Sequence, residues 1–279
     1  MNKILLKINK LVSNWLIKDI YRPINEKLTD FTRLCQHITP ADIILAEGRS
    51  RVSRAIRAIT QSPWTHAALY IGRLKDLTPE QQLILSKHYS GPNNIPLLIE
   101  SNMGKGVTIE PLDNYTHYHL RICRAEGIKP EGINTVINYA ISKIGYPYDN
   151  RQVFDLVRFF IPWWILPTRW RSTLFRHNAG GSTKLTCSLL IAEAFYQAKF
   201  PILPVITEQK IKSYFELIQR NPRLMVPCDF DYSPFFKVIK YPIIDLANLD
   251  EDSIVWKESL ISNDGYGLLE QIQETAQSE

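Results

Sequence analysis

The stretch STKLTCSLLIAEAF (residues 182–195) places a single cysteine between a polar approach and an apolar run. The spacing after Cys187 predicts a helix that begins at or beside the cysteine, with Thr186 as its N-cap. The apolar residues at helical spacing are Leu190, Ile191, Ala194, Phe195 and Ala198. In a first helical turn, free backbone N–H groups and the helix dipole stabilise a thiolate and can receive an oxyanion. The same pattern also fits a small core residue, which is how most free cysteines behave.

A histidine and a glutamate upstream are the candidate partners of this thiol. His66 opens the predicted strand 65–72, and Glu100 lies near the end of the predicted strand 96–101. If the two strands pair antiparallel, the end of the second lies beside the start of the first. A carboxylate that accepts the Nδ1 proton of His66 would leave Nε2 free to act as a base. The alternative is a half-exposed histidine and an ordinary strand-end glutamate.

The elements around these residues alternate between short strands and helices. Strands are expected over 41–48, 65–72, 96–101, 106–112, 118–125 and 235–241, and helices over 49–60, 77–89 and 132–145. The three strands between 96 and 125 follow one another with Gly or Asn near their joints, as in an antiparallel meander. The pattern therefore indicates an α+β fold in which an antiparallel sheet packs against helices.

Composition restricts the class of protein. With 279 residues, 45% of them apolar, the chain can bury a full core. Its four cysteines lie far apart without a CxxC pair, which argues against a disulfide scaffold and a zinc ribbon and favours a reducing compartment. We expect no metal and no cofactor. No apolar run is long enough to span a membrane.

The two ends of the chain differ from its middle. Residues 1–20 carry lysines on one stripe of a possible amphipathic helix, which could lie on an anionic membrane surface or pack on the domain. Because lysines interrupt the apolar stretches of residues 1–20, we do not expect this segment to be an export signal. Residues 248–279 hold eight acids and one base, which leaves the body basic. We therefore expect a leader (1–38), one domain (39–245) and an acidic C-terminal extension (246–279), the last either solvated or a loosely docked helix.

Several of these runs resemble a known family. ADIILAEGRSRVSRAIRAITQSPWTHAALYIG, LLIESNMGKGVTIEPL, YHLRICRA, IGYPYDNRQVFDLVRFF and TCSLLIAEAF are together similar to the YiiX/YebB-like branch of the NlpC-type cysteine hydrolases. The resemblance implies a circularly permuted papain-like fold with the catalytic cysteine at a helix N-terminus. It further implies Cys187 as nucleophile, His66 as base and Glu100 as orienting residue, acting without a cofactor through a thioester. The motif order, with histidine first and cysteine last, is specific to the permuted arrangement.

The substrate is the least determined part of this interpretation. Trp163 and Trp164 lie in an aromatic segment rich in arginine that could admit a lipid acyl chain or form a lid, and Tyr148 is a further candidate for substrate contact. A hydrolase of peptide or amide bonds, a lipid-directed thiol acyltransferase or lipase, and a non-catalytic binding protein at a membrane all remain open. Nucleic acid is not expected as a partner, because no recognised module accompanies the aromatic and basic residues. The expected location is cytoplasmic, with peripheral membrane contact as an option.

Overall fold

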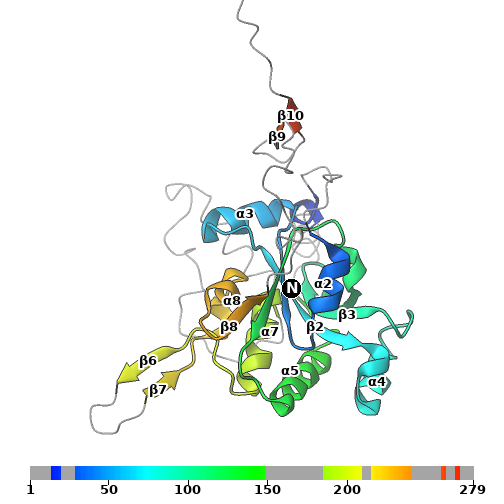
Figure 1. Cartoon of the computed structure of the whole chain (residues 1–279), viewed down its shortest axis with the longest axis vertical. Coiled ribbons are helices and arrows are strands. Elements are labelled where there is room, and N and C mark those ends of the chain that lie inside the picture. Colours follow the sequence, from blue (N-terminus) through cyan, green and yellow to red (C-terminus); the bar gives the residue numbers. More distant parts are fainter. Residues whose placement is uncertain are drawn as a thin grey trace, which may run out of the picture.

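The computed structural model describes residues 14–19, 29–148, 185–208, 215–239, 259–261 and 268–270 (Figure 1). The described part of the leader is helical at residues 14–16. The α-helices are α2 (Phe31–His37), α3 (Arg51–Thr60), α4 (Pro79–Leu85), α5 (Pro130–Ser142), α7 (Cys187–Gln197) and α8 (Cys228–Tyr232). Short 3-10 helices are η1 (Leu74–Asp76), η2 (Leu112–Tyr115) and η6 (Pro222–Leu224).

The centre of the fold is a six-stranded antiparallel sheet with the order β4-β3-β2-β1-β5-β8. Its strands are β1 (Ile43–Ala46), β2 (His66–Arg73), β3 (Pro96–Asn102), β4 (Gly106–Pro111), β5 (Leu120–Ala125) and β8 (Phe236–Ile239). Each expected strand and helix is present within a few residues of its predicted bounds. These elements confirm the α+β class with an antiparallel sheet packed against helices.

The predicted meander is correct for β3 and β4 and wrong for β5. β5 does not pair with β4; it crosses the sheet and pairs with β1 on one side and β8 on the other. The 3-10 helix η2 turns the chain directly after β4. Strand β1 pairs with β2 along one edge, so its other edge is available to β5. Pairing there satisfies the backbone groups of both β1 and β5.

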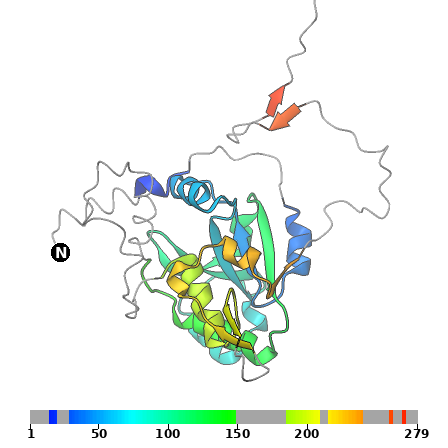
Figure 2. The same ribbon diagram turned by 90° about the vertical axis from the view of Figure 1, so that its left-hand side faces the viewer.

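Both faces of the sheet are covered, which explains why its central strands are apolar at consecutive positions. Ile43, Leu45 and Leu69 face the core formed with α5 and α7, whereas Ile44 and Ala68 face the core formed with α2 and η2. Figure 2 shows α2 on one side of the sheet, with α5 and α7 on the other. The alternation of side chains along a strand produces this division.

Helix α7 lies at the centre of the larger core. Eight of its eleven residues are buried, from Cys187 to Phe195. A helix that is apolar nearly all round is stable only inside a protein. Its N-terminal end is therefore held in a fixed position relative to the strands that it packs against.

Two small sheets were not expected from the sequence. β6 (Val205–Glu208) pairs with β7 (Phe215–Ile218), and β9 (Ser259–Ile261) pairs with β10 (Leu268–Glu270). In the C-terminal extension the described residues are thus strands and not the helix considered above. Within the described ranges, no helix has both the length and the apolar character needed to cross a membrane.

Candidate active site

Cys187 is the first residue of helix α7, as the sequence predicted. The side chain of Thr186 caps the helix by accepting a hydrogen bond from the backbone N–H of Leu189 at 3.4 Å. The carbonyl of Thr186 accepts from Leu190 at 3.0 Å. The backbone N–H groups that precede Leu189 have no acceptor inside the helix, because no helical carbonyl group precedes the first turn. They are the donors that can face an oxyanion beside the thiol.

The chain just before α7 is tied to the strand that carries Glu100. Ser101 of β3 donates its hydroxyl proton to the carbonyl of Leu185 at 2.7 Å, and Leu185 donates its N–H to the carbonyl of Pro147 at 3.1 Å. Leu185 also forms a parallel bridge with Tyr148. These bonds fix the start of α7 against the end of β3, so the thiol and the carboxylate approach each other from different elements.

His66 and Glu100 meet on one face of the sheet. The β2–β3 register pairs Leu69 with Ile99. In this register, the next pair along the two strands is Ala68 with Glu100. Glu100 therefore lies diagonally across from His66 on the same face of the sheet. The His66 Nε2 atom lies 2.8 Å from the Glu100 Oε2 atom, and the side chains are 18% and 3% exposed. The antiparallel pairing inferred from sequence is therefore confirmed.

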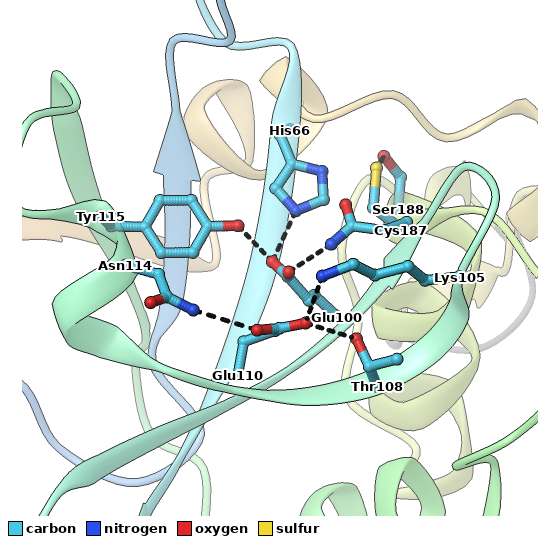
Figure 3. A network of polar contacts seen from close by, with 10 residues as sticks. His66, Glu100, Lys105, Thr108, Glu110, Asn114, Tyr115, Cys187 and Ser188 are labelled. Atoms are coloured by element: carbon cyan, nitrogen blue, oxygen red, sulfur yellow. Dashed lines mark hydrogen bonds and ion pairs between the residues drawn. The ribbon is translucent and has the colours of Figure 1, made fainter. Parts of the chain in front are cut away.

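The ring nitrogen assigned to the carboxylate is corrected by the structure. We expected Nδ1 of His66 to face Glu100, but Nε2 does so. Nδ1 is nearer to the backbone, and Figure 3 shows this second ring nitrogen on the side of Cys187. Nδ1 is thus the atom available for proton exchange with the thiol.

Two residues that the sequence analysis missed complete the surroundings of Glu100. The Tyr115 hydroxyl donates to Oε2, and the Asn102 side-chain amide donates to Oε1 (Figure 3). The Tyr115 ring is parallel to the His66 ring, at 4° and 6.3 Å between centroids. Asn102 follows Glu100 by two positions on the same strand face, a signal that period-two reasoning could have used. Tyr115 lies in η2, and no local pattern points to it.

The charges of this group shift its pKa values in complementary directions. Burial raises the pKa of the Cys187 thiol, but the hydrogen bond and charge of His66 outweigh it, so the pKa is lowered overall. Burial lowers the pKa of His66, and the Glu100 charge with the hydrogen bonds of Cys187 and Glu100 reverses this and raises it. Burial also opposes ionisation of Glu100, yet His66, Tyr115 and Asn102 keep its pKa lowered. A thiolate–imidazolium pair backed by a carboxylate is the state that these shifts favour.

A second carboxylate lies beside this group without joining it. Glu110 of β4 accepts hydrogen bonds from Lys105 at 3.1 Å, Thr108 at 3.3 Å and Asn114 at 3.0 Å (Figure 3). The β3–β4 register sets Thr108 opposite Glu100, which puts Glu110 one step along the same face. Its partners differ entirely from those of Glu100.

The thiol opens into a cleft of about 530 Å³. Its lining includes Cys187, His66 and Glu100, together with apolar side chains of α3 and the β3–β4 hairpin: Val52, Ile56 and Met103. Tyr148, which we predicted to contact the substrate, also lines the cleft and packs beside Leu16 and Met103. Trp163 and Trp164 lie outside the described residues. A cleft of this size accommodates a small organic group.

The remaining cysteines have a different character. Cys123 and Cys228 are buried, and burial raises their pKa values to about 12 and about 11 respectively. Burial raises the pKa of the half-buried Cys35 as well. Within the part of the chain that the structure describes, no group of three or more His, Cys, Asp or Glu side chains is placed to hold a metal ion.

A thiol at a helix N-terminus, with an imidazole and a carboxylate in line behind it, is the arrangement of the cysteine hydrolases. Residues 37–156 match the model of a family described as permuted papain-like amidase enzymes, the YaeF/YiiX or C92 family. This segment of the chain is thus similar to the YiiX-like permuted papain branch of the cysteine hydrolases, which supports the resemblance found in the sequence. The matched segment contains His66 and Glu100 and ends before Cys187.

Other comparisons add little to this assignment. The crystal structure of the metalloprotein yiiX from Escherichia coli O157:H7 is similar with a TM-score of 0.45 and 16% sequence identity. The similarity covers 73% of this chain and 97% of that one. No curated protein matches the sequence.

Proposed function

We propose that the chain hydrolyses an amide or peptide bond through a thioester on Cys187, with His66 as acid and base and Glu100 as orienting carboxylate. The observation that carries this proposal is the convergence of the three side chains from α7, β2 and β3 with a lowered pKa of the Cys187 thiol. A buried thiol without such a partner has a raised pKa, as Cys123 and Cys228 do. The family assignment independently supports an amide as substrate.

The proposed reaction has the following steps. The Cys187 thiolate attacks the amide carbonyl carbon, and the negative oxygen lies near the free N–H groups of the first turn of α7. Imidazolium at His66 gives its Nδ1 proton to the nitrogen of the leaving amine as the carbon–nitrogen bond breaks. A water molecule then loses a proton to His66 and attacks the thioester, which releases a carboxylic acid and restores the thiol. Glu100 holds the ring at Nε2 throughout and stabilises its charge.

Acyl transfer to an alcohol or amine is the second candidate, and the apolar cleft wall of Val52, Ile56 and Met103 favours an acyl chain as the transferred group. Both reactions share the attack and the thioester and differ only in the molecule that resolves it. Product analysis with and without an added acceptor separates them: free acid indicates hydrolysis, whereas an ester or a new amide indicates transfer.

The first test is the pH dependence of alkylation by iodoacetamide, with the modified cysteine identified by peptide mass mapping. We expect Cys187 to react with an apparent pKa well below the free-thiol value of about 8.5. The other three cysteines serve as internal controls, because burial raises their pKa values. In His66→Ala the low-pH reactivity should disappear while the circular dichroism spectrum is unchanged.

Two results would contradict the proposal. A Cys187 thiol that reacts like a free cysteine and ignores the His66 substitution would make it a core residue, and the chain a binding protein. A reactive thiol whose Cys187→Ala variant retains full amide hydrolysis would place the nucleophile elsewhere. A panel of chromogenic amides and peptides provides this second measurement.

A further inference from the structure

A basic and apolar surface borders the mouth of the cleft. We call it the docking patch and define it by residues of the short N-terminal segment and of α3: Trp15, Ile17, Lys18, Arg51 and Arg54. Trp15 is 59% exposed and Ile17 is 40% exposed. Lys18 and Arg54 are exposed, and Arg51 is half-buried. Large apolar side chains and cations thus share one surface.

Specific contacts hold this surface together. The guanidinium carbon of Arg51 lies 4.7 Å from the centre of the Trp15 ring, and its Nη1 donates to the Trp15 carbonyl at 3.1 Å. The backbone N–H of Arg51 donates to the Lys18 carbonyl at 3.4 Å, and Asp19 forms a bridge with Ser50. The segment therefore lies against the start of α3. Figures 1 and 2 show the two side by side at the end of the molecule away from α4.

The docking patch and the cleft share a wall. Ile17 belongs to the patch and also lines the cleft that contains Cys187, and it does so with Val52 and Ile56 of α3. An apolar wall therefore runs from the patch into the cleft that contains the thiol.

The balance of charge indicates what covers the patch. Within the described residues 14–19 and helix α3, the basic residues of the patch are accompanied by one acidic residue, Asp19. Glu47 is engaged by Arg57 at 2.8 Å and by His119 at 3.2 Å. A tryptophan with one face on an arginine is suited to the boundary between lipid head groups and acyl chains. Basic side chains there gain from anionic head groups.

We propose that the docking patch binds the surface of an anionic lipid bilayer, with the cleft mouth facing the lipid, so that the substrate is an amide presented by the membrane. This inference rests on the proposed amidase function for the meaning of the cleft, but lipid binding itself does not require catalysis. Trp15 and Ile17 enter the interface, and the basic side chains contact phosphate groups.

The experiment is co-sedimentation of the full chain with two vesicle types, phosphatidylcholine alone and phosphatidylcholine with about one third phosphatidylglycerol. We expect binding only to the anionic vesicles, with affinity falling as salt rises. Lys18→Gln with Arg54→Gln should weaken binding roughly 25-fold, since each basic residue near an anionic surface contributes about fivefold. Trp15→Ala should weaken it about tenfold. The matched controls on and near α4, Lys75→Gln with Lys87→Gln and Leu83→Ala, remove equally exposed side chains and should bind normally.

A second readout tests the orientation of the cleft. Anionic vesicles at a concentration that just saturates the natural sequence should slow iodoacetamide alkylation of Cys187 several-fold, and at the same concentration they should slow it less in Trp15→Ala. Failure to bind anionic vesicles, equal losses in patch and control variants, or unslowed alkylation on the membrane would each overturn the proposal. Binding to single-stranded RNA, lost in the patch variants, without binding to vesicles would identify a nucleic-acid surface instead. None of these results depends on the Cys187 pKa in free solution, which tests the amidase proposal separately.

Discussion

Replacement of Glu100 by glutamine is the most direct perturbation of the site. Glutamine has the size of glutamate and keeps one carbonyl oxygen, but it removes the negative charge 2.8 Å from the Nε2 atom of His66. The side chain is only 3% exposed, so water does not replace the lost charge. The change therefore isolates the electrostatic contribution of the carboxylate to the imidazolium.

The size of the effect follows from the contacts. An opposite charge at this range typically shifts a pKa by about 1–3 units. Glu100→Gln should lower the pKa of His66 by that amount, because Glu100 is the strongest influence that raises it. The ratio of the thiolate–imidazolium pair to the neutral thiol–imidazole pair then falls about tenfold to a thousandfold, since the two protons titrate as a coupled pair.

The ultraviolet absorbance of the Cys187 thiolate and its iodoacetamide alkylation rate measure this ratio across pH. We expect the reactivity below the ordinary thiol range to shrink and the main rise in rate to move to higher pH. Thiolate without an imidazolium partner must form in a buried position, and burial raises the thiol pKa.

Glu110→Gln is the matched control. Glu110 is also a carboxylate of the cleft lining, but its partners are Lys105, Thr108 and Asn114. Its replacement should leave the profile within a few tenths of a pH unit. An unchanged profile in Glu100→Gln, or equal changes in both variants, would refute the assignment of Glu100 as the group that supports the His66 charge.

Three further substitutions test how the site is held. Tyr115→Phe removes a hydroxyl that donates to the buried Glu100 carboxylate, and it should cost about 1.5–3 kcal/mol in urea unfolding and reduce low-pH alkylation. Unchanged low-pH alkylation in Tyr115→Phe would instead show that the hydroxyl has no electrostatic role. Thr186→Ala removes the N-cap of α7 and should cost about 1 kcal/mol, with no cost if the cap bond is not formed in solution. Gly106→Ala adds a Cβ atom at 2.3 Å from the Tyr146 carbonyl and at a φ of +82°, so it should lower stability by about 2 kcal/mol or more; a neutral result would contradict this close approach.

Local patterns predicted the elements well because each has a strong signal within a few residues. Helix α3 was expected over 49–60 and α4 over 77–89. In the structure α4 begins at Pro79, and Thr78 forms a capping box with Gln81. Strand β2 was expected to end near Gly72, where the register with β3 shifts. Such signals depend on residues within one turn of a helix or along one strand.

Long-range pairing was harder to infer. The position of β5 beside β1 could not be read from β4 and η2, because a strand pairs equally well with any free edge of suitable polarity. Val52 and Ile56 of α3 are half-buried and line the cleft, which the spacing of apolar residues along the helix did not predict. An amphipathic helix indicates that one face leaves water and does not say what that face meets.

Helical and strand periodicity were enough to predict that Cys187 begins a capped helix, that His66 opens a strand, and that Glu100 can reach it across an antiparallel pair. Two features became visible only in the folded protein: Nε2 of His66 faces the carboxylate, and Tyr115 joins it from η2. The physical reason is that ring orientation and hydrogen bonds between distant segments depend on the packing of whole elements, which no local spacing encodes.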